Sequence, residues 1–170
     1  MSDTAKSSPG NPRGGQHEAH YAATSAGYAG GCTCFYLRSA TRRITQVYDE
    51  GLKAAGISVN QFSLLSQLSR NGGISVTTFA EIMSMDRTTL TRNLQPLQAA
   101  GWVVSGGTAG RSKLLTLSDA GQAKLREAIP LWRVAQAKVN EVLGSERQRA
   151  LHRTLKESIR SFETQQVLGS

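Results

Sequence analysis

The order of apolar and polar residues along the chain predicts a mainly helical fold. From Cys32 onward, apolar or small residues recur at alternating steps of four and three, the spacing of a helix that packs along another helix. Gly56 is expected to end this first helix. The apolar or small residues that form this stripe of the first helix are Thr33, Leu37, Ala40, Ile44, Val47, Gly51 and Ala54.

Residues 1–31 are rich in Ser, Gly, Pro and Ala without periodicity, which predicts a flexible tail.

Three further helices each have a residue that can cap their first turn. Ser58 and Gln61 form a capping box, in which each side chain accepts a hydrogen bond from the other residue's backbone N–H. That helix is expected to end at "NGG", residues 71–73. Ser75 can cap a short helix, and Asp86 can cap the next, where its charge suits the positive end of the helix dipole. The apolar residues of these helices are Phe62, Leu65, Leu68, Phe79, Ala80, Ile82 and Met83.

After Gly101 the period changes from helical to extended. The segments "WVVS" and "KLLTL" flank "GGTAGRS", which predicts two strands joined by a glycine-rich hairpin. Ser118 and Asp119 then begin a long helix that contains Pro130, where a kink is expected because proline removes a backbone donor. Gly144 is expected to stop this helix.

The last helix carries a second long apolar stripe. Ser145 and Gln148 have the spacing of another capping box and predict its start. His152 is interpreted as a surface residue of this helix. The stripe consists of Leu151, Leu155, Ile159 and Phe162.

Charge favours a polyanionic partner. The formal net charge of +8 and the sequence pI near 10.0 suit phosphate groups, because contacts to nucleic acid release condensed counterions. The hydrophobic fraction of 39% with 19% charged residues is typical of a globular chain without a membrane span. No signal-peptide pattern opens the sequence, so the cytoplasm is expected, and the two cysteines are expected to be reduced.

The stretch "DRTTLTRNLQPLQAAGWV", residues 86–103, predicts a helix with one leucine face and one polar face. Thr88, Arg92 and Gln95 lie on the far side from the leucines, and no acid beyond the cap accompanies them. Such donors suit base edges and phosphates. With a short helix and tight turn before it, and a hairpin carrying Arg111 and Lys113 after it, the pattern predicts a winged helix-turn-helix. The leucine face consists of Leu90, Leu94 and Leu97.

The segments "FAEIMSMDRTTLTRNLQPLQAAGWV" and "RSKLLTLSDAG" resemble the MarR family of bacterial transcription regulators, and the resemblance covers roughly residues 32–163. The matching features are the order of helices, the Thr-Arg-rich recognition helix, the Gly-Trp-Val exit into a wing and the Leu-Ser-x-x-Gly start of a long helix. The resemblance implies a homodimer that binds a palindromic operator in double-stranded DNA. It further implies a repressor that is released by a small aromatic ligand or an oxidant.

The same resemblance implies roles for individual residues. The threonines of the recognition helix and Arg92 would lie in the major groove, and Arg111 would reach a minor groove from the wing. Ala109 stands where many relatives have an orienting Asp, and the hairpin looks about two residues short, so the wing is expected to grip weakly. The candidate DNA-binding residues are Ser75, Thr77, Asp86, Arg87, Thr88, Thr89, Thr91, Arg92, Gln95, Arg111 and Lys113.

We therefore expect mainly α structure with a small β-wing: a winged helix-turn-helix DNA-binding domain at 58–117, dimerisation helices at 32–57 and 118–163, and the tail at 1–31. The stripes of the outer helices are too long for one small winged domain to cover, so a dimer is expected to hold two recognition helices about 34 Å apart. The alternative is a winged-helix protein-interaction module without specific DNA binding. Sequence does not separate a repressor from an activator.

A possible redox site involves Cys34. "CFYLRSATRRITQVY" is similar to the first helix of organic-peroxide sensors in this family, and Tyr48 falls where one of their tyrosines stands. Val59 occupies the place expected for the second tyrosine. Nearby arginines could lower the pKa of the thiol. The competing interpretation is that Cys34 is a small, buried apolar residue.

Catalysis and metal binding are not expected. His17, His20, Cys32 and Cys34 could be drawn as four ligands, but their spacing fits no common zinc motif. The sequence also lacks a phosphate-binding glycine loop after a strand, a nucleophile elbow and paired acids in a plausible cleft. We therefore expect no enzyme, no metal and no cofactor.

Overall fold

The computed structural model describes residues 31–109 and 112–165. Within the chain two compact units are distinguished, Met1–Arg42 and Arg43–Ser170, and the boundary between them falls inside the first helix described. Nearly all of the predicted tail, together with His17, His20 and Arg111, lies outside the described residues.

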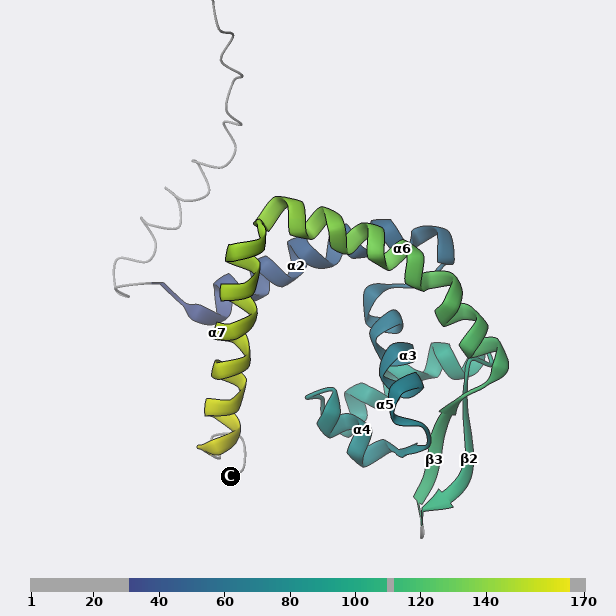
Figure 1. Ribbon diagram of the computed structural model, residues 1–170. Coiled ribbons are helices and arrows are strands. Elements are labelled where there is room, and N and C mark those ends of the chain that lie inside the picture. The colour runs from purple at the N-terminus through teal and green to yellow at the C-terminus, as the bar shows by residue number, and fades with distance from the viewer. Residues whose placement is uncertain (1–30, 110–111, 166–170) are drawn as a thin grey trace, which may run out of the picture. The chain divides into compact units, whose positions relative to one another are not determined.

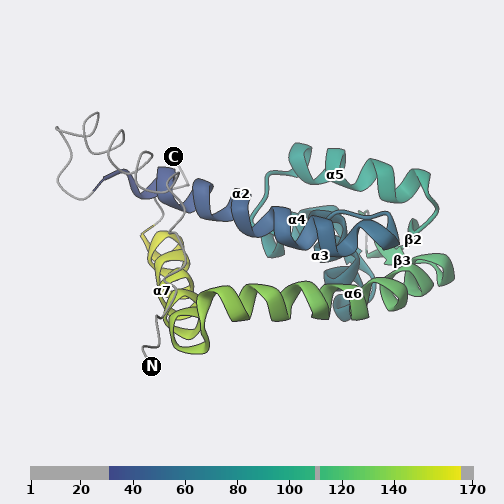
Figure 2. The same cartoon turned by 90° about the horizontal axis from the view of Figure 1, so that it is seen from above.

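The architecture is mainly helical with a small antiparallel sheet, as the sequence predicts (Figure 1). Helices α3, α4 and α5 gather around the base of a hairpin made of β2 and β3. Figure 2 shows α5 and α6 on opposite sides of α3, and α3 contacts both helices. The elements in chain order are α2 (Thr33–Leu52), the 3₁₀ turn η1 (Lys53–Ala55), α3 (Val59–Asn71), β1 (Ile74–Ser75), α4 (Val76–Ile82), α5 (Arg87–Ala99), β2 (Val103–Ala109), β3 (Ser112–Leu117), α6 (Asp119–Leu143) and α7 (Ser145–Thr164).

Four of the predicted helix starts are confirmed by their cap hydrogen bonds. The Ser58 hydroxyl accepts from Gln61 N at 3.2 Å, and Gln61 Oε1 accepts from Ser58 N at 2.9 Å, which completes the capping box. Ser75, Asp86 and Ser118 cap α4, α5 and α6 in the same way, each accepting from the backbone N–H three residues later. These bonds satisfy helix N–H groups that have no partner within the helix.

The first helix is closed at Gly56 as predicted, but its last turn has a tighter form that was not predicted. Its last turn tightens into η1, and Gly56, with φ of +65°, closes it as a left-handed cap. The tightening shifts the phase of the stripe, so that Leu52 and Ala55 are buried while Ala54 is exposed. Gly51 keeps its predicted packing role, because a Cβ there would come within 2.7 Å of the Ala135 side chain on α6.

The sheet is larger than the predicted hairpin. Both strands continue into the glycine-rich segment. Gly106 and Thr108 of β2 each pair with a residue of β3, and Gly107 between them, with φ of +65°, forms a bulge. The two-residue strand β1 was not predicted. It pairs with β3 through Ile74 and Leu115, giving the strand order β1-β3-β2.

One hydrophobic core holds the winged region together with the neighbouring ends of η1 and α6. Leu64, Leu65, Phe79 and Leu90 are among its most completely buried side chains. Burying one such side chain stabilises a fold by about 1.5–3 kcal/mol. The core also includes Leu52, Ala55, Ile57, Phe62, Leu68, Ile74, Ala80, Leu94, Leu97, Val103, Leu115, Leu125 and Ala128.

The junction between the hairpin and α6 is very tight. Ser118 donates from its hydroxyl to the Gly101 carbonyl at 2.6 Å and from its backbone to the Trp102 carbonyl at 3.1 Å. A Cβ on Gly121 would lie only 2.1 Å from that same Trp102 oxygen. Lys124 adds a cation–π contact, with Nζ 5.4 Å from the centre of the Trp102 ring. These contacts fix the direction in which the wing leaves the domain.

The predicted capping box at Ser145 is wrong. Ser145 is already the first residue of α7, Gly144 occupies the cap position with φ of +74°, and no side chain caps the helix. The Gln148 amide instead donates to Asn140 Oδ1 on α6. Helix α6 is continuous across Pro130.

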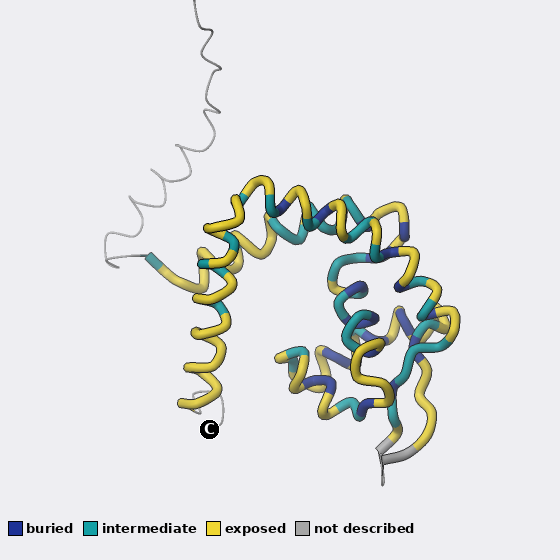
Figure 3. The backbone as a smooth tube through the Cα atoms, viewed as in Figure 1, coloured by how far each residue is buried: buried dark blue, intermediate teal, exposed yellow. Residues whose placement is uncertain are grey.

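The apolar stripe of α7 is not buried in the single chain. Ile159 and Phe162 are 52% and 57% exposed, Leu151 and Leu155 are half-buried, and no residue of α7 is buried, so a single chain leaves the stripe largely uncovered (Figure 3). Val134 and Val142 on α6 are also exposed. None of the helices in the described residues is long and apolar enough to cross a bilayer.

Candidate nucleic-acid interface

Helix α5 is anchored by the three leucines that the sequence assigns to its inner face. Leu90 and Leu97 are fully buried and Leu94 is 2% exposed. All three belong to the core that α5 shares with α3, α4 and β2. Because the anchoring residues span two turns, the opposite face of α5 has a defined direction.

The turn between α4 and α5 depends on one left-handed residue. Ser84 has a backbone φ of +51°, a conformation that residues other than glycine seldom adopt. Its backbone N–H donates to the Glu81 carbonyl, and Met85 N donates to the Ala80 carbonyl at 2.9 Å. These bonds set the short connection of the helix-turn-helix. No sequence signal identified Ser84, since Gly or Asn is the usual residue in such a position.

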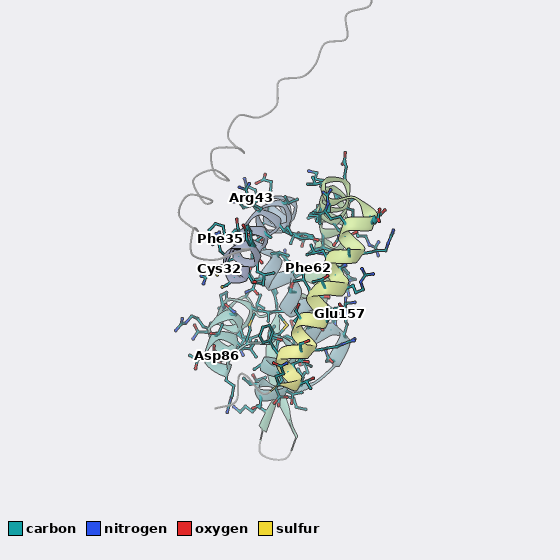
Figure 4. All side chains as sticks on the ribbon, turned by 90° about the vertical axis from the view of Figure 1, so that its left-hand side faces the viewer. Cys32, Phe35, Arg43, Phe62, Asp86 and Glu157 are labelled. Carbon is teal, nitrogen blue, oxygen red and sulfur yellow. The ribbon has the colours of Figure 1, made fainter. Side chains whose placement is uncertain are left out.

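Asp86 and Thr89 form a closed cap at the start of α5. Asp86 Oδ1 accepts from Thr89 N at 2.8 Å, and the Thr89 hydroxyl donates to Asp86 Oδ2 at 2.6 Å. These two bonds, the side-chain bond first, lower the pKa of the Asp86 carboxyl. Asp86 is labelled in Figure 4. The Thr89 hydroxyl is therefore already engaged within the protein.

The outward side of α5 collects five exposed polar residues that line one open surface hollow. We call them the recognition face: Arg87, Thr88, Thr91, Arg92 and Gln95. The Thr91 hydroxyl donates to the Arg87 carbonyl at 2.7 Å, so its proton is used and its oxygen remains available as an acceptor. Among the described residues, ion pairs occur at Lys53–Glu50 and Lys124–Glu127, so neither arginine of this face is neutralised by one.

The other candidate DNA-binding residues lie around this face with different exposure. Ser75 is half-buried, and its hydroxyl is used by the cap of α4, whereas Thr77 is exposed on the first turn of that helix. Lys113 is exposed on β3, where its backbone pairs with Thr108 beside the Gly107 bulge. The position of Arg111 is outside the described residues.

Cys34 and Tyr48 belong to different compact units, so each is described separately. Cys34 is exposed on the first turn of α2, which contradicts its interpretation as a buried apolar residue. The Tyr48 hydroxyl donates to Gln136 Oε1 at 2.6 Å, and its ring stacks on Trp132. Burial raises the pKa of Tyr48. Among the described residues, no three His, Cys, Asp or Glu side chains are grouped so as to hold a metal ion.

A short helix, a tight turn, a leucine-anchored helix with a cationic polar face and a following hairpin together define a winged helix-turn-helix DNA-binding protein. Comparison with known proteins agrees. Residues 55–112 match the profile of the MarR family. The chain is similar to the transcriptional regulator MosR from M. tuberculosis, whose crystal structure is known. The two sequences are 32% identical, the structures match with a TM-score of 0.66, and the match covers 78% of this chain and 98% of MosR. The chain belongs to the MarR family of transcription regulators.

Two further solved structures extend this comparison. MosR in complex with DNA is 34% identical, with a TM-score of 0.67, and the match covers 77% of this chain and 98% of that one. The transcriptional repressor CouR, bound to p-coumaroyl-CoA, is 25% identical, with a TM-score of 0.70 and coverage of 77% and 94% respectively. Together with the fold, the family and the DNA-bound MosR structure identify the chain as a DNA-binding transcription regulator. The comparison with curated protein sequences gave no match.

Proposed function

We propose that the chain acts in the cytoplasm as a homodimeric repressor that binds a palindromic operator and releases it when an effector binds or oxidises the protein. The observation that carries the DNA-binding part is the recognition face of α5. Its two arginines are exposed and outside any ion pair in the described residues, and its Thr and Gln side chains supply hydrogen-bond donors and acceptors. Arginine and glutamine are suited to base edges in the major groove, to guanine and adenine respectively.

The roles within the face differ. Arg92 and Gln95 are proposed to contact base edges, because their side chains are long and exposed and lie beyond the first turn of the helix. Arg87 and Thr88 lie at the helix start, where phosphates are attracted by the free N–H groups. Asp86 and Thr89 are proposed to act mainly by holding that start in shape, since their side chains bond to each other.

The wing supplies a second, weaker contact in this proposal. Lys113 is an exposed cation on β3. The family resemblance implies a second DNA-contacting cation, Arg111, at the hairpin tip. Ala109 takes the place of an acid that could orient Arg111. We therefore propose that Ser75, Thr77, Lys113 and Arg111 position the protein on the phosphate backbone, while α5 supplies specificity.

Dimer formation is supported by the uncovered apolar surface. The α7 stripe and the exposed valines of α6 together form apolar surface that a single chain leaves in contact with water. A two-fold related copy would cover it and hold two recognition faces one helical turn of DNA apart. Such symmetry implies a palindromic operator. MosR in complex with DNA supports DNA binding by similarity, and the transcriptional repressor CouR supports repression.

The test of DNA recognition begins with operator selection from a random duplex library by the full chain. Arg92→Ala should then lower affinity for the selected operator at least about thirtyfold, because a good base contact contributes about 1–3 kcal/mol and is lost in both half-sites. Arg111→Ala should lower it less and mainly reduce the salt dependence.

The matched control is Arg126→Ala, which removes the same charge from the exposed surface of α6. Near-normal operator affinity of Arg92→Ala in an anisotropy titration would reject the assignment of the recognition face. The alternative function, a protein-interaction module, predicts that wild-type binding to duplex DNA hardly changes with salt, whereas phosphate contacts require a steep dependence.

Release by an effector is the second part of the proposal. CouR in complex with p-coumaroyl-CoA supports a small aromatic ligand by similarity. The exposure of Cys34 on α2 supports oxidation as a separate route, since a thiol must be accessible to react with a peroxide. Tyr48 is proposed, by the family resemblance alone, as a sensor tyrosine that pairs with Cys34 of the other subunit.

The oxidant route is tested with an organic peroxide. Wild type should lose operator affinity after treatment, because sulfenic acid formation at Cys34 alters the helix that takes part in dimerisation. Cys34→Ser should bind the operator normally and keep its affinity in the presence of peroxide. Equal affinities of treated and untreated wild type and variant would remove the redox route and leave a small ligand as the effector.

A further inference from the structure

Helix α7 has a second ordered surface besides its apolar stripe. Arg149, Arg153, Lys156 and Arg160 follow one another at steps of four, three and four, and we call them the basic row. At 100° per residue the four positions lie within an arc of about 60°, and this arc is centred about 135° away from the apolar stripe. Covering the stripe with a partner helix would therefore leave the basic row facing outward.

The hollow that the basic row lines is cationic, because one acid, Glu157, accompanies four cations. All four side chains are exposed, and together with His152 and Glu157 they line one surface hollow. Figure 4 marks Glu157 on α7. Although Glu157 and Glu163 are within one helical turn of row members, none of the four cations is in an ion pair among the described residues.

Within the row itself the charges repeat without an acid, although Glu157 lies four residues after Arg153 and three before Arg160. Exposed helices usually place acids and bases at steps of three or four, where opposite charges stabilise the helix and like charges destabilise it. In the basic row every successive pair at these steps consists of two cations. The repulsion disappears when an anion lies across the row, so the pattern favours a bound polyanion over a merely soluble surface.

The shape of the row indicates which polyanion fits. Its ends are eleven residues apart, about 16 Å along the helix axis, which exceeds the reach of a single phosphate but matches several consecutive backbone phosphates. Three of the four residues are arginines, which bind phosphate with paired N–H groups. No Phe, Tyr or Trp lines the hollow, and His152 is its one ring, so it lacks the series of aromatic side chains on which successive bases of a single strand stack.

We propose that the basic row of α7 is a second, sequence-independent DNA-binding surface that holds the phosphate backbone of duplex outside the operator half-sites. The proposal extends the proposed function, because duplex DNA is the partner of both surfaces. Only the recognition face distinguishes sequences. The row would increase affinity for long DNA and let one dimer hold flanking or separate duplex segments.

The test uses the full chain and the variant Arg149→Gln/Arg153→Gln/Lys156→Gln/Arg160→Gln, which keeps helix-forming side chains. Anisotropy titrations over a salt series are made with a long duplex without the operator and with a short operator duplex that ends at its half-sites. We expect the variant to bind the long duplex at least about tenfold more weakly, with the salt slope reduced by about 0.9 for each lost phosphate contact. Affinity for the short operator should stay unchanged.

A matched control removes four cations elsewhere, in Lys53→Gln/Arg126→Gln/Arg133→Gln/Lys138→Gln, from exposed positions of η1 and α6. An equal loss in this control would overturn the proposal in favour of net charge, and an unchanged salt slope in the row variant would overturn it outright. Tighter wild-type binding to polyglutamate than to the long duplex would overturn it in favour of an acidic protein partner. If no operator were selected, the recognition face would fail while the long-duplex comparison still decided the row.

Discussion

At the scale of single residues, two positions have geometry that their neighbours impose. Ser84 adopts a left-handed conformation because the chain must reverse between α4 and α5 within four residues. Gly121 lies so close to the Trp102 carbonyl that a methyl group does not fit. The first sets the angle between the helices of the DNA-binding motif, and the second sets how the hairpin meets α6.

Gly121→Ala should destabilise the protein by about 1–3 kcal/mol, because overpacking against a backbone atom forces the α6–hairpin junction apart. At an ordinary helical position the same change would stabilise the helix by up to about 1 kcal/mol, so the sign alone is diagnostic. Urea unfolding measures the difference. The reverse change at an exposed position, Ala123→Gly, is the control and should cost only the helix propensity of about 1 kcal/mol.

At the scale of elements, α5 depends on a charged cap. The pKa of Asp86 is lowered in the folded protein by its bonds to Thr89, so its carboxylate contributes stability that is complete above the unfolded value, near 3.8. That contribution is lost as pH falls through the lower, folded value. The physical reason is that a protonated carboxyl accepts hydrogen bonds less well and no longer suits the helix dipole.

Comparison of wild type with Asp86→Asn should show this pH dependence. Asn caps helices about as well as Asp but carries no charge, so wild type should be the more stable protein near neutral pH. The difference should shrink toward zero on acidification into the range below pH 3.8. Thermal unfolding over a pH series measures it. A constant difference between the two proteins at every pH would show that the charge of Asp86 does not stabilise α5.

The remaining elements show where local patterns succeed. Ser58, Ser75, Asp86 and Ser118 are confirmed as helix caps because each makes its bond to a backbone N–H three residues later, within a distance that the sequence itself specifies. The Ser145 box failed because a residue on another helix, Asn140, takes the Gln148 amide. Competition from outside the local segment cannot be inferred from spacing.

At the scale of the whole molecule, the exposed apolar stripe of α7 has the largest consequence. A homodimer would bury it, and a single chain leaves Ile159 and Phe162 more than half exposed. Because the proposed operator is palindromic, the spacing of two recognition faces depends on this interface. Binding of DNA and association of subunits should therefore weaken together.

Phe162→Glu should convert the protein to monomers that retain their helical content. Burial of one phenylalanine stabilises by about 1.5–3 kcal/mol, and a symmetric interface loses it twice, so the dimer should weaken at least about a hundredfold. Analytical ultracentrifugation measures association, and operator affinity should fall with it. Thr154→Glu adds the same charge to an exposed position of α7 off the stripe and should remain dimeric. A dimeric Phe162→Glu protein would place the interface elsewhere.

The sequence by itself determined most of the helices, the leucine anchor of α5 and the polar composition of its outer face. These features arise from interactions between residues three or four apart, and periodicity expresses them directly. It also indicated the family through the segment from the short helix to the wing. The candidate DNA-binding residues of α5 were found for the same reason, since one helix carries them all.

Only the tertiary structure decided features that join distant segments. Strand β1 exists because Ile74 meets Leu115, and two residues alone show no strand pattern. Gly121 is required by the carbonyl of Trp102, and the bond that displaces the Ser145 cap comes from Asn140. In each case the energy comes from a contact between residues that are remote in sequence or on different elements, whose proximity is set by packing of the whole core rather than by local preference.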